Sequence, residues 1–104
     1  MPDRVIVEVD EDLSDLIPDF LTHKRAEVAT IFDALARRDY AGISGLAHRI
    51  KGEGGSYGFD SMTEMARSLE HAAAVRDDGA VTTLARQLLS YMDRVEVRFQ
   101  PSKE

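Results

Sequence analysis

Apolar residues recur every three or four positions along four long segments of this sequence, and only short breaks separate the segments. Such spacing places apolar side chains on one face of a helix. The segments cover about residues 18–38, 39–57, 60–73 and 81–99. Because short connections make consecutive helices antiparallel neighbours, the sequence predicts an all-α fold, an up-down antiparallel four-helix bundle.

The ends of these helices carry recognisable signals. Asp39 and Asp60 are expected N-caps, and Gly58 is an expected helix end. Pro18 is tolerated only near a helix start, so a short extra N-terminal helix is expected to end near Ile17. Pro101 is expected to end the last helix, which is predicted to reach as far as Phe99. The resulting division is an extended lead-in at 1–10, a bundle at 11–100 and a tail at 101–104, and no linker is long enough to divide domains.

Charge and composition exclude several classes of protein. The net charge of −6 resides in residues 1–20, since the remaining residues hold twelve basic and twelve acidic side chains. A chain without a broad positive field is not expected to bind nucleic acid. Without cysteine there is no disulfide and no thiolate metal site. No apolar run is long enough to cross a membrane and no signal peptide is expected, so the predicted location is cytoplasmic.

One helical segment carries residues that a scaffold does not need. Four glycines fall within positions 52–58, and glycine inside a helix costs about 1 kcal/mol relative to alanine. At about 100° per residue, His48, Lys51, Gly52 and Gly55 share a narrow sector that faces away from the apolar stripe. Arg49 lies nearby but is rotated out of this sector. An exposed imidazole beside a cation and a surface without side chains has the geometry of a docking site.

A carboxylate on the next helix is expected beside this imidazole. His48 precedes Gly58 by ten residues and Glu70 follows Asp60 by ten, so each lies about 15 Å along its helix from the turn. Glu70 should therefore reach the height of His48. A carboxylate that accepts a hydrogen bond from Nδ1–H fixes the tautomer and leaves Nε2 as the nucleophilic nitrogen.

The segment around His48 resembles the histidine-containing phosphotransfer (HPt) domain of two-component phosphorelays. The family pattern is Ala-His-x-(Leu/Ile)-Lys-Gly, followed by small residues and a glycine ten positions after the histidine. The sequence matches it at Ala47, His48, Ile50, Lys51, Gly52 and Gly58. The run through Tyr57-Gly58-Phe59 and the presence of Glu70 are similar to the phosphotransfer domain of chemotaxis histidine kinases. Glu53 departs from the small residue usual at its place.

The resemblance implies a phosphocarrier that is not itself a kinase. His48 would be phosphorylated on Nε2, Lys51 would stabilise the phosphate, and Glu70 would orient the imidazole. Gly52, Gly55, Arg49 and Gly58 are the expected partner-docking positions. The expected partners are response-regulator receiver domains and a histidine kinase of the hybrid or chemotaxis type. The receiver would supply Mg²⁺, the chain would need no cofactor of its own, and a monomer is expected.

Two other readings fit a helical bundle. A non-catalytic helical adaptor would carry His48 as an incidental surface residue, or would dock receivers without accepting phosphate. A metal-binding bundle needs Glu-x-x-His repeats that project inward from paired helices, and this sequence contains none. The combination of His48, Lys51, Gly52 and Gly58 on one helix favours the phosphocarrier over both.

Overall fold

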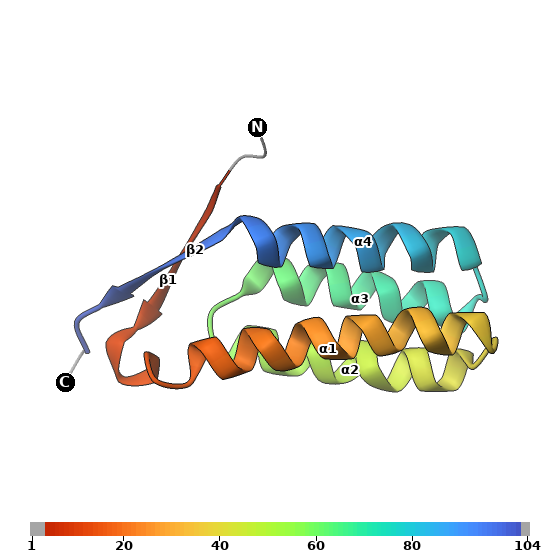
Figure 1. Cartoon of the computed structure of the whole chain (residues 1–104), viewed down its shortest axis with the longest axis horizontal. Helices are drawn as coiled ribbons and strands as arrows, with labels where there is room; N and C mark the ends of the chain where they lie inside the picture. Colours follow the sequence, from red (N-terminus) through yellow and green to blue (C-terminus); the bar gives the residue numbers. More distant parts are fainter. Residues whose placement is uncertain (1–3, 103–104) are drawn as a thin grey trace.

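The computed structural model describes residues 4–102 and contains the predicted bundle. Its helices are α1 (Ile17–Ala36), α2 (Tyr40–Ser56), α3 (Asp60–Ala74) and α4 (Asp78–Arg94). Consecutive helices run in opposite directions along one long axis (Figure 1). The all-α, up-down arrangement predicted from apolar spacing is therefore confirmed.

Three helices end in the same way, which explains how such short connections reverse the chain. After α1, the Asp39 amide donates to the Ala34 carbonyl at 2.8 Å and the Arg38 amide donates to the Leu35 carbonyl at 3.0 Å. Equivalent pairs of bonds end α2 and α3, and the residue inside each turn has a positive φ: Arg38, Gly58 and Arg76. This is the Schellman arrangement, in which glycine is the least strained residue.

Of the two N-caps that the sequence predicts, one is confirmed and the other is wrong. The Asp39 carboxylate accepts from the Gly42 amide at 2.9 Å, as predicted, and Asp77 caps α4 through the Ala80 amide. Asp60 is not an N-cap, contrary to expectation. It is the first residue of α3, and the buried Phe59 occupies the cap position without a side-chain hydrogen bond. Phe59 sits there because its ring fills the core beside Phe20, with ring centroids 5.4 Å apart.

The inner face of α2 determines what its outer face presents. Ile43, Ala47 and Ile50 are fully buried, and Gly54 continues the same stripe. A β-carbon at Gly54 would lie only 3.1 Å from the Thr63 hydroxyl oxygen and 3.4 Å from Met62, so these two side chains of α3 pack directly against the backbone of α2. Thr63 also donates a hydrogen bond to the Lys51 carbonyl oxygen at 2.8 Å, which joins the two helices.

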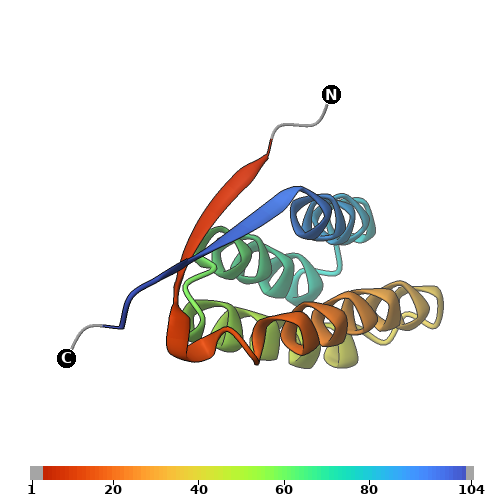
Figure 2. The ribbon, with the colours of Figure 1, turned by 60° about the vertical axis from the view of Figure 1, so that its left-hand side comes forward.

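The two ends of the described chain form a small sheet that the sequence did not predict. Strand β1 (Val5–Asp10) pairs in parallel with β2 (Val95–Gln100), with Val7 opposite Val97. Both strands pass the end of the bundle at which α1 begins (Figure 2). Val7 and Val9 are buried, whereas the outward-facing Ile6 is 51% exposed. The expected lead-in at 1–10 is thus a paired strand from residue 5 onward, and residues 1–3 lie outside the described part.

Two helix boundaries differ from the expected ones. The last helix does not reach Phe99: it ends at Arg94, because Val95 adopts an extended backbone and enters β2. The short N-terminal helix is a single 3₁₀ turn, η1 (Glu11–Leu13), and α1 begins at Ile17, so that Pro18 lies in its first turn. In the described part of the chain, none of the helices combines the length and apolar character needed to span a membrane.

Candidate functional site

His48 stands on the outer face of α2, about midway along the helix. Its side chain is 70% exposed, while its neighbour Ala47 and Ile50, two positions on, are fully buried. The helix therefore directs the imidazole into solvent, as the apolar stripe predicts. Imidazole nitrogens are nucleophilic when neutral, and an exposed ring can meet a partner protein without movement of the backbone.

Glu70 on α3 holds one nitrogen of this ring. Its Oε2 lies 3.2 Å from Nδ1 of His48, at the long end of the hydrogen-bond range. The hydrogen bond and charge of Lys51 lower the pKa of the Glu70 carboxyl, with a smaller contribution from His48. An ionised carboxylate can only accept hydrogen bonds, so Nδ1 must carry the proton. In the neutral form of the ring, Nε2 would then hold the free lone pair, on a side chain that is 70% exposed.

Lys51 binds the other oxygen of the same carboxylate. Its Nζ lies 2.8 Å from Oε1 of Glu70, one helical turn beyond His48. The sequence predicted separate tasks for Lys51 and Glu70 but not this contact. The height argument that places Glu70 beside His48 would also have placed it within reach of a lysine one turn on. The three side chains therefore form one unit, an imidazole and an ammonium bridged by a carboxylate.

The glycines near His48 serve different purposes. A β-carbon at Gly52 would meet no atom within 4 Å, so there is open space above the helix surface at this position. At Gly55 a β-carbon would be in ordinary contact with the Thr63 hydroxyl at 3.4 Å, so Gly55 lies at the edge nearer α3. Gly58 is required by its φ of +87°, where a side chain would be strained. Of these three glycines, Gly52 alone is exposed with no packing or backbone reason for glycine, and Gly45, one turn before His48, has equally open surroundings.

Arg49 points away from the carboxylate unit and joins a second network. Its guanidinium donates to Oε2 of Glu27 on α1 at 3.0 Å. The other oxygen of Glu27 binds the ammonium of Lys24, which also donates to Glu53 at 2.6 Å. Lys24 is only 3% exposed. Glu53, the residue that departs from the family pattern, thus neutralises a buried cation that the sequence gave no reason to expect.

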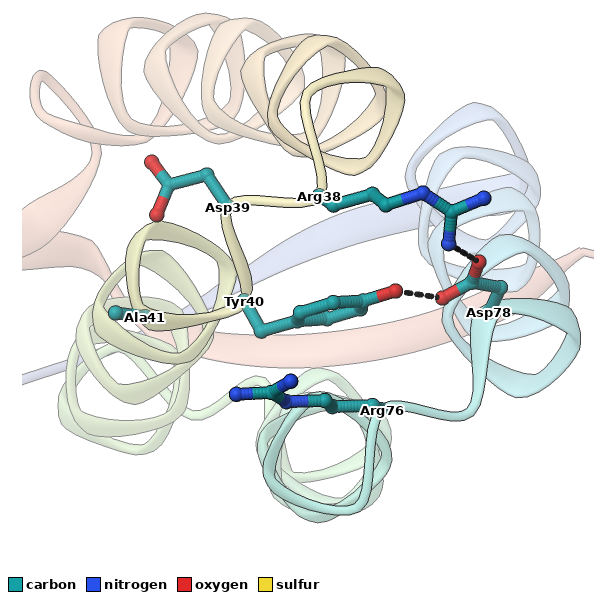
Figure 3. A pocket seen from close by; sticks show the side chains of 6 residues that line it. All are labelled: Arg38, Asp39, Tyr40, Ala41, Arg76 and Asp78. Atoms are coloured by element: carbon teal, nitrogen blue, oxygen red, sulfur yellow. Dashed lines mark hydrogen bonds and ion pairs between the residues drawn. The ribbon is translucent and has the colours of Figure 1, made fainter.

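The opposite end of the bundle has an open pocket of about 580 Å³ that is remote from His48. Figure 3 shows Arg38 and the hydroxyl of Tyr40 both directed at the carboxylate of Asp78, while Arg76 lies along the Tyr40 ring. The guanidinium carbon is 5.5 Å from the ring centroid. The polar groups of this pocket bind one another and fasten the α1–α2 connection to the start of α4.

No cluster of three or more metal-binding side chains occurs within residues 4–102. The described residues therefore give the metal-binding reading no support. What the His48 face offers is an exposed imidazole with one nitrogen bound to a carboxylate and a lysine one turn away. This arrangement suits the transfer of an anionic group between proteins, because a partner must supply the remaining charge and enclosure.

The comparison with known protein families agrees with this arrangement. The family model of the Hpt domain matches residues 7–97, and the chain belongs to this family. The match extends from within β1 to within β2 and includes all four helices. The family assigns the chain a histidine phosphotransfer role in phosphorelays, in which such domains interact with kinases and receiver domains. The searches of curated proteins and of solved structures returned no match.

Proposed function

We propose that His48 accepts a phosphoryl group on Nε2 from a receiver aspartate or a kinase and passes it to the aspartate of another receiver. The observation that carries this proposal is the bond between Nδ1 and Glu70, combined with the 70% exposure of the ring. The other two histidines, His23 and His71, are exposed as well, but neither lies in a comparable arrangement of carboxylate and lysine among the described residues.

In the proposed transfer no proton has to move, because Nδ1 of His48 already carries one. The Nε2 lone pair attacks the phosphorus of the donor's aspartyl phosphate, the P–O bond breaks, and the aspartate leaves as a carboxylate. Nδ1 keeps its proton throughout, so no general base is needed. In the reverse step a receiver carboxylate attacks the phosphorus and returns the lone pair to Nε2. The receiver supplies Mg²⁺ in this proposal, and transfer depends on alignment and charge neutralisation.

Lys51 is proposed to stabilise the phosphate by donating hydrogen bonds to it and to Glu70 at the same time. The ammonium group has three donors, of which the 2.8 Å bond to Glu70 uses one. A phosphoryl group on Nε2 brings close to two negative charges to the same surface and gives the remaining donors a partner. Lys51 can therefore contact both groups, and its bond to Glu70 keeps the long side chain ordered before phosphate arrives.

Gly52 is proposed as the place where the receiver's active-site loops come closest to the helix. Its open surroundings support this role directly. Gly55 and Arg49 border the same face and are proposed as rim contacts. Gly58 stays a predicted docking position at the end of α2, although its backbone conformation already accounts for the glycine.

The deciding experiment pairs two histidine substitutions. His48→Gln and His71→Gln are incubated with receivers that have been charged by a small-molecule phosphodonor, and the receivers are drawn from the source genome. We expect wild type and His71→Gln to acquire acid-labile, base-stable phosphate, whereas His48→Gln should acquire none and keep its helical circular dichroism. Phosphate retained by His48→Gln would refute the assignment. A full set of receivers, none of which transfers to wild type, would favour the adaptor reading.

A further inference from the structure

The outer edge of β2 is an unpaired strand edge. A strand in a two-stranded sheet uses half of its backbone groups for its neighbour and leaves the other half on the far side. Among residues 4–102, the Val95 amide donates to the Tyr91 carbonyl oxygen at the end of α4, and the other backbone hydrogen bonds of β2 are those of its pairing with β1. Native proteins usually cover or disrupt such edges, because an exposed edge is a template for another strand. Strand β2 spans six residues and contains no proline.

The two strands differ in what surrounds them. The α2–α3 turn approaches β1, since a β-carbon at Gly58 would lie 3.5 Å from the Glu8 carbonyl oxygen. In contrast, β2 runs off the end of the bundle toward the C-terminus (Figure 2), and the side chains of Arg98, Phe99 and Gln100 are exposed. The accessible edge of the sheet is therefore the one that belongs to β2.

The sequence of β2 is complementary to itself when it is read in the opposite direction. In an antiparallel pair centred on Val97, Glu96 of each copy faces Arg98 of the other, and Val95 faces Phe99. Opposite charges and apolar pairs directly across an antiparallel pair are stabilising. Val95 and Val97 already pack against the core, so the second copy would extend the same apolar face over Phe99, which is 44% exposed.

The charged groups of β2 are placed to exchange partners at little cost. Within one chain, Arg98 lies 3.0 Å from Oε2 of Glu96, and Arg4 lies 2.8 Å from Oε1. These contacts lower the pKa of the Glu96 carboxyl, Arg4 first and Arg98 next, so the group is ionised near neutral pH. An exposed pair of this kind contributes little to stability, and Arg98 can turn to the Glu96 of a second copy.

The edge of β1 has no such complementarity. An antiparallel pair centred on Val7 sets Ile6 against Glu8, and a pair centred on Glu8 sets two carboxylates against each other. The strand contains acidic side chains and no basic one. The edge of β2 therefore favours pairing with a second copy of the chain, whereas the edge of β1 disfavours it.

We propose that two copies of this chain associate through antiparallel pairing of their β2 edges, in register at Val97. The product is a four-stranded sheet in the order β1-β2-β2-β1, closed by a two-fold axis. With this interface the chain would be a dimer, in contrast to the monomer expected from the sequence. His48 lies ten residues before Gly58, about 15 Å along α2, so both phosphotransfer faces stay open. The inference concerns a different surface from the proposed function and stands apart from it.

Sedimentation of the full chain tests the interface. The apparent mass of wild type should rise with concentration from 11.6 kDa toward twice that value. Arg98→Glu places Glu96 opposite a second glutamate at both ends of the pair and should weaken association about tenfold or more. Arg86→Glu, the same charge change at an exposed position on α4, is the matched control and should leave association unchanged. A wild type that stays monomeric at about 1 mM overturns the proposal, and so does equal association of both variants.

A mixing experiment tests the register. Glu96→Arg makes both facing positions basic and Arg98→Glu makes both acidic, so each variant alone should associate poorly and an equimolar mixture should recover a dimer of the two. Failure of the mixture to associate would contradict the pairing. If loss of the Arg4 contact unfolds Glu96→Arg, hydrogen exchange of wild type at low and high concentration is decisive. Slower exchange in β2 at high concentration supports the interface, and unchanged exchange overturns it.

Discussion

Gly52 and Gly54 lie two residues apart on α2, yet alanine should have opposite effects on folding stability at the two positions. A β-carbon at Gly52 meets no atom within 4 Å. Gly52→Ala therefore gains the helix propensity that glycine lacks, about 1 kcal/mol, without any clash. For a domain of this size the midpoint of thermal unfolding should rise by about 4–8 °C.

At Gly54 the same gain is opposed by overpacking. The new β-carbon would be 3.1 Å from the Thr63 hydroxyl and 3.4 Å from Cγ and Sδ of Met62. Thr63 cannot retreat freely, because it is hydrogen-bonded to the Lys51 carbonyl. Overpacking costs about 1–3 kcal/mol, so Gly54→Ala should be destabilised by about 1 kcal/mol after the propensity gain.

Phosphotransfer distinguishes the purposes of the two glycines. Stability is measured by circular dichroism during heating, and single-turnover transfer from a charged receiver is measured on the same samples. Gly52→Ala should be more stable than wild type but slower in transfer, and Gly52→Gln slower still, because a side chain obstructs the receiver. Gly54→Ala should transfer normally while it remains folded. A destabilised Gly52→Ala, or a fully active Gly52→Gln, would refute the reasoning that Gly52 serves docking.

Three further predictions concern charged side chains. Lys51→Ala should slow transfer with little loss of stability, and an unchanged transfer rate would remove its proposed role. Glu70→Gln should reduce the Nδ1–H tautomer of His48 in ¹⁵N NMR. The variant should also be less stable than wild type above pH 4.5, because the contacts that lower the pKa of Glu70 stabilise only its ionised form. This difference in stability should vanish as the pH falls through the lowered pKa. Lys24→Met leaves two carboxylates facing each other without their buried cation and should cost about 2 kcal/mol in denaturant unfolding. An unfolding free energy equal to that of wild type would contradict this last account.

The bundle and the position of the imidazole could be predicted because both depend on local periodicity. Apolar residues such as Ile43 and Ile50 fix the buried face of α2, and the remaining angular positions then follow for His48 and Gly52. The same reasoning placed Glu70 at the correct height, because the turn at Gly58 sets the register of two antiparallel helices. These predictions required no knowledge of distant contacts.

The terminal sheet could not be predicted in this way. The partners Val7 and Val97 are ninety residues apart, and a short alternating segment has no strand signal until its partner is known. Residues 95–99 continue the apolar spacing of α4 closely enough to resemble more helix. Pairing with β1 outweighs that local preference and ends α4 at Arg94.

The ion pairs were also beyond reach from the sequence alone. Glu53 seemed only an unexpected charge on α2, because its buried partner Lys24 lies on another helix. Long side chains can reach several neighbours, and the choice among them depends on interhelical distances that periodicity does not give. The exception is the contact between Lys51 and Glu70, because the height argument that places Glu70 beside His48 also brings it within reach of a lysine one turn on.

The most direct test of the central claim is the position of the phosphorus atom on the phosphorylated protein. ¹⁵N-labelled chain is charged by a phosphorylated receiver, and coupling between phosphorus and the imidazole nitrogens is recorded by NMR. We predict coupling to Nε2 of His48 alone, with a proton retained on Nδ1. Phosphorus bonded to Nδ1 of His48, or to His23 or His71, would contradict the account.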